Sequence, residues 1–336
     1  MLEKLIFLFL AFIFMGCTST ADTVINNTTT TTTTTTTISS QLIRLNINAP
    51  SLANNIVNES ATQAIAVYLP PSYKLNTTQT YPVIYFLPGF SNTVDNFLSS
   101  SFVSLKQSMD NLITKNTIKE AILVIVNGKN IYGGSFYTNS DVTGNWDDFV
   151  SKDVINYIDT NYRTIKKANS RAICGHSMGG SGAITIGMKH SDIFGLVYAL
   201  SPGLFDTNGL NDALTTWDSY FMNAYGRAFA PNLAKNPPYD DVNANRVKWE
   251  SGFGNLTEKI STYKTNLNSL KLLTVEYGFY DYYSWIPKGC VYFNSLLTTN
   301  NIKNNLYKHN GDHESLLKSR IEQVMLPELS NNFEYQ

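Results

Sequence analysis

Hydrophobic residues after position 40 fall into short runs, separated by longer stretches with helical spacing. Several of these runs are continuous rather than alternating, as in strands that are covered on both faces. The expected strands are residues 64–69, 83–87, 121–126, 171–175, 196–200, 272–277 and 305–308. The expected helices are residues 96–112, 146–162, 182–190 and 289–297. Strands that alternate with helices predict an α/β fold with a mostly parallel sheet, in which ligands bind beyond the carboxyl ends of the strands.

Residues 205–263 interrupt this alternation. The segment contains helical fragments, the helix breaker Asn236-Pro237-Pro238, and several aromatic residues that look exposed, such as Trp217, Tyr220 and Phe221. It is too long for a simple connection between two elements. Two interpretations fit it equally well, a lid over the active site and a structural excursion that packs on the outside of the fold.

The first 17 residues have the layout of an export signal. Lys4 precedes an apolar stretch, residues 5–15, that is shorter than the ~20 residues of a membrane span. Gly16-Cys17 follows, and this ending resembles the bacterial lipoprotein signal, in which the cysteine is acylated. We therefore predict an exported protein of the bacterial cell envelope, periplasmic or surface-facing, anchored to a membrane by a lipid on Cys17. The alternative is an ordinary cleaved signal with an incidental cysteine.

Residues 18–40 consist almost entirely of Thr, Ser and Asn. Such a stretch has little to bury and cannot offset the entropy that ordering would cost, so we expect a disordered tether. The folded domain then covers residues 41–336. Its two cysteines, Cys174 and Cys290, lie in apolar or helical surroundings and are expected to be free buried thiols.

The composition narrows the choice of partner. Hydrophobic residues make up 43% of the 336 residues and charged residues 15%, which suits a large buried core. The net charge is −1, so the chain has no overall basic field to hold a nucleic acid. The expected partner is a small or neutral molecule.

Gly175-His176-Ser177-Met178-Gly179 fits the pattern G-x-S-x-G. In that pattern a serine stands on a strained turn between a strand and a helix, and small residues on either side prevent clashes. The expected strand before it and the glycine-rich helical stretch after it supply this context. Ser177 is therefore the expected nucleophile, and a purely structural turn is the alternative.

The base and the acid follow from their order in the chain. In this fold the acid and then the histidine come after the serine, which leaves His309 and His313 as candidates for the base. His313 is favoured because it lies in a turn beyond the last expected strand. Asp281 is the expected acid, since it follows a strand end. Glu276 lies within that strand, and Asp312 is too close to His313 in the chain.

An oxyanion hole needs two backbone N–H groups. The residue after the nucleophile, Met178, supplies one. The second is expected in the tight turn Pro88-Gly89-Phe90 that follows an expected strand. Phe90 is the expected donor, because proline has no N–H and Gly89 supplies the bend.

At this point the chain resembles the esterase D, feruloyl esterase and S-formylglutathione hydrolase branch of the α/β-hydrolases, which also includes mycolyltransferases and enterochelin esterases. The matching pieces are VYLPPSY (67–73), YPVIYFLPG (81–89), GSFYT (134–138), YRT (162–164), GHSMGG (175–180), G-x-x-D (278–281) and GDH (311–313). The resemblance implies an α/β-hydrolase fold, a triad of Ser177, Asp281 and His313, and Phe90 and Met178 at the oxyanion hole. In the third piece, Tyr137 is a candidate substrate contact.

Two departures from the family pattern leave the preferred substrate open. Pro88 stands where His or Asp is common, and the segment after Phe205 is longer than in compact members. Tyr280, Tyr282, Tyr283 and Trp285 surround the expected acid, where they either form an apolar substrate wall or pack beneath residues 205–263. Trp285 is the residue we expect to contact substrate.

Together these features predict a serine esterase that works through an acyl-enzyme, without a metal or organic cofactor. The expected substrate is an acyl ester of a carbohydrate or of a similar small extracellular molecule. Two alternatives remain. An acyltransferase of the mycolyltransferase type would use the same residues, and a binding protein would have kept the fold and lost activity.

Overall fold

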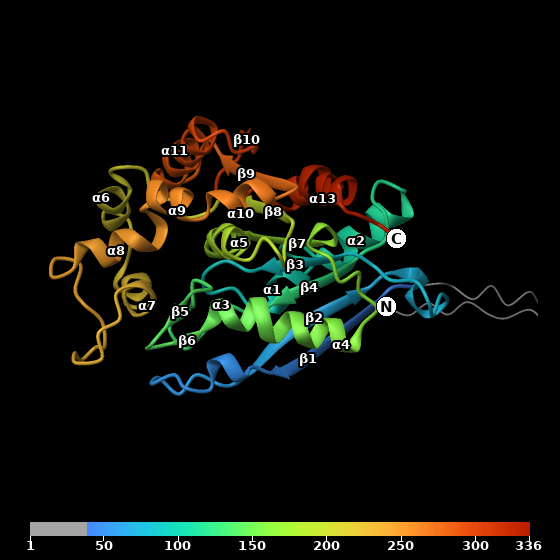
Figure 1. The fold of residues 1–336 in the computed structure, drawn as a ribbon, viewed down its shortest axis with the longest axis horizontal. Helices are drawn as coiled ribbons and strands as arrows, with labels where there is room; N and C mark the ends of the chain where they lie inside the picture. Colours follow the sequence, from blue (N-terminus) through green and yellow to red (C-terminus); the bar gives the residue numbers. More distant parts are fainter. Residues whose placement is uncertain (1–38) are drawn as a thin grey trace, which may run out of the picture. The chain divides into compact units, whose positions relative to one another are not determined.

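The central sheet holds eight strands in the order β1-β2-β4-β3-β7-β8-β9-β10 (Figure 1). The computed structural model describes residues 39–336, so the predicted export signal, Cys17 and most of the predicted tether lie outside the described residues. The strands are β1 (Gln41–Asn48), β2 (Thr62–Leu69), β3 (Val83–Leu87), β4 (Ile122–Val126), β7 (Arg171–His176), β8 (Leu196–Leu200), β9 (Leu272–Gly278) and β10 (Asn305–His309). A small separate hairpin pairs β5 (Asn139–Ser140) with β6 (Gly144–Asn145).

The sheet is mostly parallel, as predicted. Strands β4, β3, β7, β8, β9 and β10 pair in parallel, whereas β2 pairs antiparallel with both β1 and β4. All seven expected strands are present, with bounds that differ by at most two residues. Strand β1 was missed. Its residues Ile43, Leu45 and Ile47 alternate with more polar ones and pack on the core, a period-two signal that directly follows the Thr-rich stretch.

The helices come from all parts of the described chain. Their bounds are α1 (Val94–Leu98), α2 (Leu105–Thr114), α3 (Trp146–Asp148), α4 (Ile155–Asn161), α5 (Met178–Lys189), α6 (Gly209–Leu214), α7 (Ser219–Phe229), α8 (Arg246–Phe253), α9 (Leu256–Thr262), α10 (Lys264–Ser269), α11 (Trp285–Thr299), α12 (Leu317–Arg320) and α13 (Leu326–Asn332). None of the helices in residues 39–336 is long and apolar enough to cross a membrane.

One expected helix, residues 96–112, is wrong as a single element. The structure divides it into α1 and α2, because Ser99 is extended, with a ψ of 134°, and Ser104 adopts a left-handed φ of 53°, and an α-helix accommodates neither. The expected helix over residues 146–162 is one rod in which π-helical turns, Phe149–Val154, join α3 to α4.

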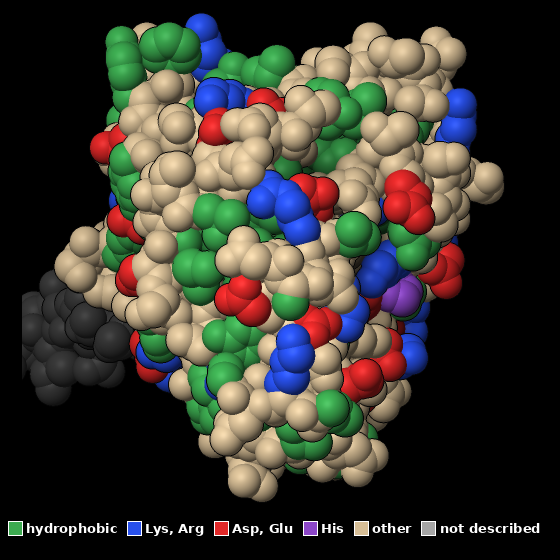
Figure 2. Space-filling model, turned by 90° about the vertical axis from the view of Figure 1, so that its left-hand side faces the viewer, with side chains coloured by type: hydrophobic (Ala, Val, Ile, Leu, Met, Phe, Trp, Pro, Cys, Tyr) green, Lys and Arg blue, Asp and Glu red, His purple; other side chains and the backbone are tan. Residues whose placement is uncertain are grey.

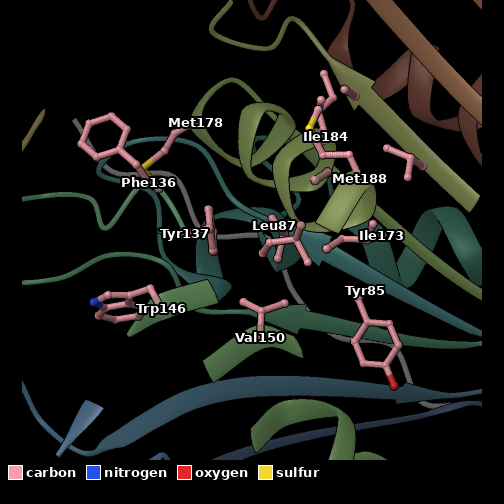
Figure 3. Close-up of a cluster of buried hydrophobic side chains, with 14 of the residues drawn as sticks. Tyr85, Leu87, Phe136, Tyr137, Trp146, Val150, Ile173, Met178, Ile184 and Met188 are labelled. Atoms are coloured by element: carbon pink, nitrogen blue, oxygen red, sulfur yellow. The ribbon is translucent and has the colours of Figure 1, made fainter. Parts of the chain in front are cut away.

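The core has two layers, one on each face of the sheet. Along β3, the side chains of Val83, Tyr85 and Leu87 join one layer, and those of Ile84 and Phe86 join the other. Figure 3 shows part of the first layer, where side chains of the sheet meet those of α5. Both faces are buried, which explains why the central strands are continuous apolar runs. Both described cysteines are free and buried, as expected.

The parallel strands bring separate loops to one edge of the sheet. Strands β3, β7, β9 and β10 all end there, since their carboxyl ends are aligned, for example His309 of β10 beside Gly278 of β9. The segment 205–263 forms α6, α7, α8 and α9, with α6, α7 and α8 at the left of Figure 1. Loops from four strands and this segment therefore surround one region, where the site is found.

Candidate active site

Ser177 stands on a strained turn between β7 and α5. Its φ is 56° and its ψ is −118°, a conformation that L-residues rarely adopt. The flanking glycines make the turn sterically possible. A Cβ on Gly179 would lie 1.8 Å from the carbonyl oxygen of Leu87, and one on Gly175 would lie 2.5 Å from the Gly179 backbone. The G-x-S-x-G pattern therefore reflects a close approach of three backbone segments.

The backbone N–H groups of Phe90 and Met178, two residues that line the same pocket as Ser177, have no acceptor among residues 39–336. Met178 is the first residue of α5, so its N–H cannot bond within the helix. The loop that carries Phe90 is fixed on both sides, because Ser91 N–H donates to Gly133 O at 2.8 Å and Asn92 N–H donates to Gly89 O at 3.1 Å. Two fixed donors without acceptors suit the binding of an oxyanion, and Met178 adds the partial positive charge of a helix N-terminus.

His313 and Asp281 meet beside this turn. The imidazole Nδ1–H of His313 donates to Asp281 Oδ2 at 2.7 Å. The second carboxylate oxygen, Oδ1, accepts the backbone N–H of Tyr283 at 2.9 Å, so the carboxylate cannot rotate freely. Both side chains are buried, His313 with 4% and Asp281 with 0% of its side chain exposed. This arrangement leaves Nε2 of His313 as the nitrogen available for proton transfer.

His176, inside the serine turn, connects that turn to the loop of His313. Its Nε2–H donates to the backbone carbonyl of His313 at 2.9 Å, and the two rings are 4.7 Å apart. Burial, together with the nearby His313, lowers the pKa of His176 to about 3. The ring is therefore neutral at ordinary pH, which is consistent with a single proton on Nε2 that holds the base loop in place.

The other candidates for base and acid lie apart from Ser177. His309 accepts the Gly311 N–H at Nδ1 and lies 3.8 Å from Glu276, and it is not among the residues that line the pocket around Ser177. Glu276 is buried and accepts hydrogen bonds from Arg320 and a tyrosine. Asp312 accepts backbone N–H groups of its own turn. The structure therefore brings together the predicted three residues.

Ser177 and His313 open into a pocket whose walls include seven Phe, Tyr and Trp side chains. Residues 205–263 contribute a wall of their own, consisting of Thr216, Trp217, Asp218, Phe221 and Phe253. The face of the molecule on this side shows hydrophobic side chains in small groups between charged ones, rather than as one apolar patch (Figure 2). The long segment thus both packs on the fold and encloses the site.

Trp217 is not exposed, contrary to its appearance in the sequence. Only 9% of its surface is accessible, because its ring packs against those of Phe221 and Tyr225. The ring centroids are 4.7 Å apart for Trp217 and Phe221 and 4.6 Å apart for Trp217 and Tyr225. Tyr220 is 48% exposed, as expected. The burial of Trp217 depends on helix packing within the segment, which local sequence does not reveal.

Trp285 forms part of the pocket wall and also packs beneath residues 205–263, so both interpretations of its position hold. It lines the pocket, and its ring stacks on Phe253 with centroids 5.9 Å apart. Tyr282 and Tyr283 also line the pocket, and their rings meet that of His313 edge-on at 5.4 and 5.3 Å. Tyr280 is 65% exposed and is not part of the lining.

The indole Nε1–H groups of Trp217 and Trp285 are buried without an acceptor among residues 39–336.

Tyr137 does not contact the pocket, so the expectation of a substrate contact there is wrong. The side chain is fully buried within the hydrophobic layer that Figure 3 shows. Its ring fills the space that glycines leave, since a Cβ on Gly128 or Gly182 would lie 2.1 or 2.7 Å from it. Its hydroxyl donates to Pro88 O at 3.0 Å. Tyr137 therefore supports the loop that carries Phe90.

Sequence reasoning missed several residues of the pocket, among them Asn92, Asp218, Ile286 and Glu314. Glu314 could have been found, because it directly follows His313. Asp218 could not, because only the packing of α7 brings its N-terminal end to the pocket.

A family model described as "Putative esterase" matches residues 60–332. The chain belongs to this esterase family. Its relatives include an S-formylglutathione hydrolase of Arabidopsis thaliana, 27% identical over 178 residues, which are 47% of this chain and 62% of that protein. An esterase of Mycobacterium tuberculosis is 30% identical over 130 residues, or 38% of this chain and 26% of that protein. The chain thus aligns with less than two thirds of the length of these relatives.

Solved structures confirm the fold of this esterase. A ferulic acid esterase superposes with a TM-score of 0.66 and 22% identity, covering 88% of this chain and all (100%) of that one. An S-formylglutathione hydrolase from Agrobacterium tumefaciens gives 0.62 and 17%, covering 89% and 98%. The predicted α/β-hydrolase fold and the predicted esterase family are therefore confirmed.

Proposed function

We propose that this esterase is a serine hydrolase whose triad is Ser177, His313 and Asp281. The observation that carries the proposal is the buried hydrogen bond from His313 Nδ1 to Asp281 Oδ2, in the pocket that also holds the strained Ser177. A carboxylate that fixes the imidazole through Nδ1 leaves Nε2 free to act as a base towards a serine hydroxyl.

The reaction follows from these positions. His313 Nε2 takes the proton of Ser177 as Oγ forms a bond to the ester carbonyl carbon, and the N–H groups of Phe90 and Met178 stabilise the resulting oxyanion. The carbon–oxygen bond to the alcohol then breaks, and His313 returns the proton to the departing oxygen. Water adds to the acyl-enzyme by the same route, with His313 as base, and the acid leaves as Ser177 recovers its proton.

The substrate we propose is an acyl ester of a carbohydrate or of a similar small molecule, with an apolar or aromatic acyl group. The aromatic pocket walls support this proposal, as does the likeness to proteins named as ferulic acid esterases. The two buried indole N–H groups could each donate to an oxygen on such a group, and an unpaired buried donor costs about 1–3 kcal/mol.

A panel of esters tests this substrate proposal. Acetyl, feruloyl and long-chain esters of one sugar, incubated with the protein, should show the highest kcat/KM for the feruloyl ester. A parallel set with excess free sugar measures transfer of the acyl group to the acceptor. Acylated sugar as the main product would make the protein an acyltransferase and contradict the proposed hydrolysis.

We also propose that the protein is anchored to a membrane of the bacterial cell envelope through an acylated Cys17, on the Gly16-Cys17 pattern of the sequence. Cys17→Ser is expected to move most of the protein from the membrane fraction to the soluble fraction, because acyl chains supply the hydrophobic attachment. The fractions are compared by immunoblot. Equal partitioning of both forms, with no lipid on the mature N-terminus by mass spectrometry, would exclude the anchor.

A further inference from the structure

The charged side chains that line the pocket are all acidic. Asp218 and Glu314 belong to its wall, and no Lys or Arg is among the lining residues. Asp281 lies directly behind this wall, where it pairs with His313. The site thus presents negative charge to a substrate, apart from the histidines.

The acidic groups come from three separate segments, and two of them, Asp218 and Asp281, are held by hydrogen bonds. Asp218 caps the N-terminus of α7, where its Oδ1 accepts the N–H of Phe221 at 2.8 Å. Glu314 is exposed and follows the base in the turn after β10. Their fields overlap at Tyr283, whose pKa is raised by burial first and then by the charges of Asp281, Asp218 and Glu314. Three carboxylates therefore act on the same part of the pocket.

Cationic side chains on the neighbouring helices are engaged elsewhere. Lys288 of α11 binds Asp212 at 2.6 Å, and Arg320 of α12 binds Glu276. Arg227 of α7 lies over the ring of Tyr132, 4.0 Å from its centroid. These contacts keep the positive charges away from the acidic wall.

The position of Glu314 determines which part of a bound ester lies closest to its negative charge. His313 returns a proton to the departing oxygen, so the leaving group must lie beside His313 and hence beside Glu314. The rings of Tyr282 and Tyr283 line the same side, and the faces of aromatic rings attract cations. Carboxylates and aromatic faces both favour a positive leaving group over a negative one.

We propose that the pocket selects esters by the charge of the alcohol or thiol that is released: it accepts uncharged and cationic leaving groups and rejects anionic ones. This inference rests on the proposed function. Glutathione carries a net negative charge at neutral pH, so its thioesters belong to the rejected class. The specificity thereby separates this chain from relatives that are named as S-formylglutathione hydrolases.

Three acetate esters of similar size test the proposal: those of 2-(trimethylammonio)ethanol, 3,3-dimethylbutanol and 3-hydroxypropanesulfonate, together with S-formylglutathione. The kcat/KM of the cationic ester should exceed that of the anionic ester by at least about tenfold at low salt, and the ratio should fall as salt screens the charges. Asp218→Asn and Glu314→Gln should each reduce this ratio several-fold. Asparagine retains the oxygen that caps α7.

Glu258→Gln is the matched control, since it removes the same charge from the segment 205–263 at a residue that does not line the pocket. It should leave the ratio unchanged. Equal rates for the cationic and anionic esters, or ratios that the two pocket variants do not alter, would overturn the inference. If the neutral ester is hydrolysed in a Ser177-dependent manner, the proposed function survives that result. If no ester is hydrolysed, both proposals fail.

Discussion

Ser177→Ala and His313→Ala are each expected to lower kcat/KM for a p-nitrophenyl ester by about four to six orders of magnitude. In the proposed mechanism, the first variant removes the atom that forms the acyl-enzyme, and the second removes the base that activates it. The residual rate comes from binding and from the N–H groups of Phe90 and Met178. Initial rates and thermal unfolding of each variant provide the measurement, the latter to show that the fold is retained.

His309→Ala provides the control for the base. His309 lies near the same edge of the sheet, but its contacts are with Glu276 and with its own turn. Most activity should therefore remain. An inactive His309→Ala together with an active His313→Ala would reverse the assignment.

Asp281→Ala is expected to lower kcat by about four orders of magnitude, with a much smaller change in KM. The carboxylate holds the His313 ring through Nδ1. In the proposed mechanism it also stabilises the positive charge of that ring during the reaction. Its loss leaves the ring free to rotate and to carry its proton on the wrong nitrogen. Steady-state kinetics with the same p-nitrophenyl ester measure the effect.

Asp312→Asn is the matched control for the acid, because Asp312 also neighbours His313 but is only half-buried, and its side chain accepts only hydrogen bonds of its own turn. Asparagine retains the accepting oxygen, so the turn should persist and the rate should change little. A loss of activity in Asp312→Asn, combined with an active Asp281→Ala, would show that the acid has been misassigned.

The sequence was most informative where one local rule dictates the structure. Buried parallel strands have to be continuous apolar runs, and the turn at Ser177 requires glycines, so both could be predicted. The carboxyl ends of parallel strands lie at one edge, and this rule correctly brought Asp281 and His313 together.

Side-chain direction in loops could not be predicted in the same way. Phe136 and Tyr137 both adopt positive φ, 54° and 50°, and this conformation turns the Tyr137 ring into the core. No local sequence pattern predicts such a turn, because neither Phe nor Tyr favours a positive φ. The burial of Trp217 and the approach of Asp218 likewise depend on how α7 packs, which residues distant in the sequence determine.

The intrinsic fluorescence of the two pocket tryptophans can report the binding of an ester at the site. Trp217 and Trp285 are two of the four tryptophans of the chain, their rings are 5.9 Å apart, and their N–H groups have no acceptor among residues 39–336. Indole emission responds to hydrogen bonding and to nearby quenchers, so a bound ester changes it. Trp146 and Trp249 are buried outside the pocket and contribute a constant background. In Ser177→Ala, which binds without turnover, a fluorescence titration therefore gives the dissociation constant of each ester without a label.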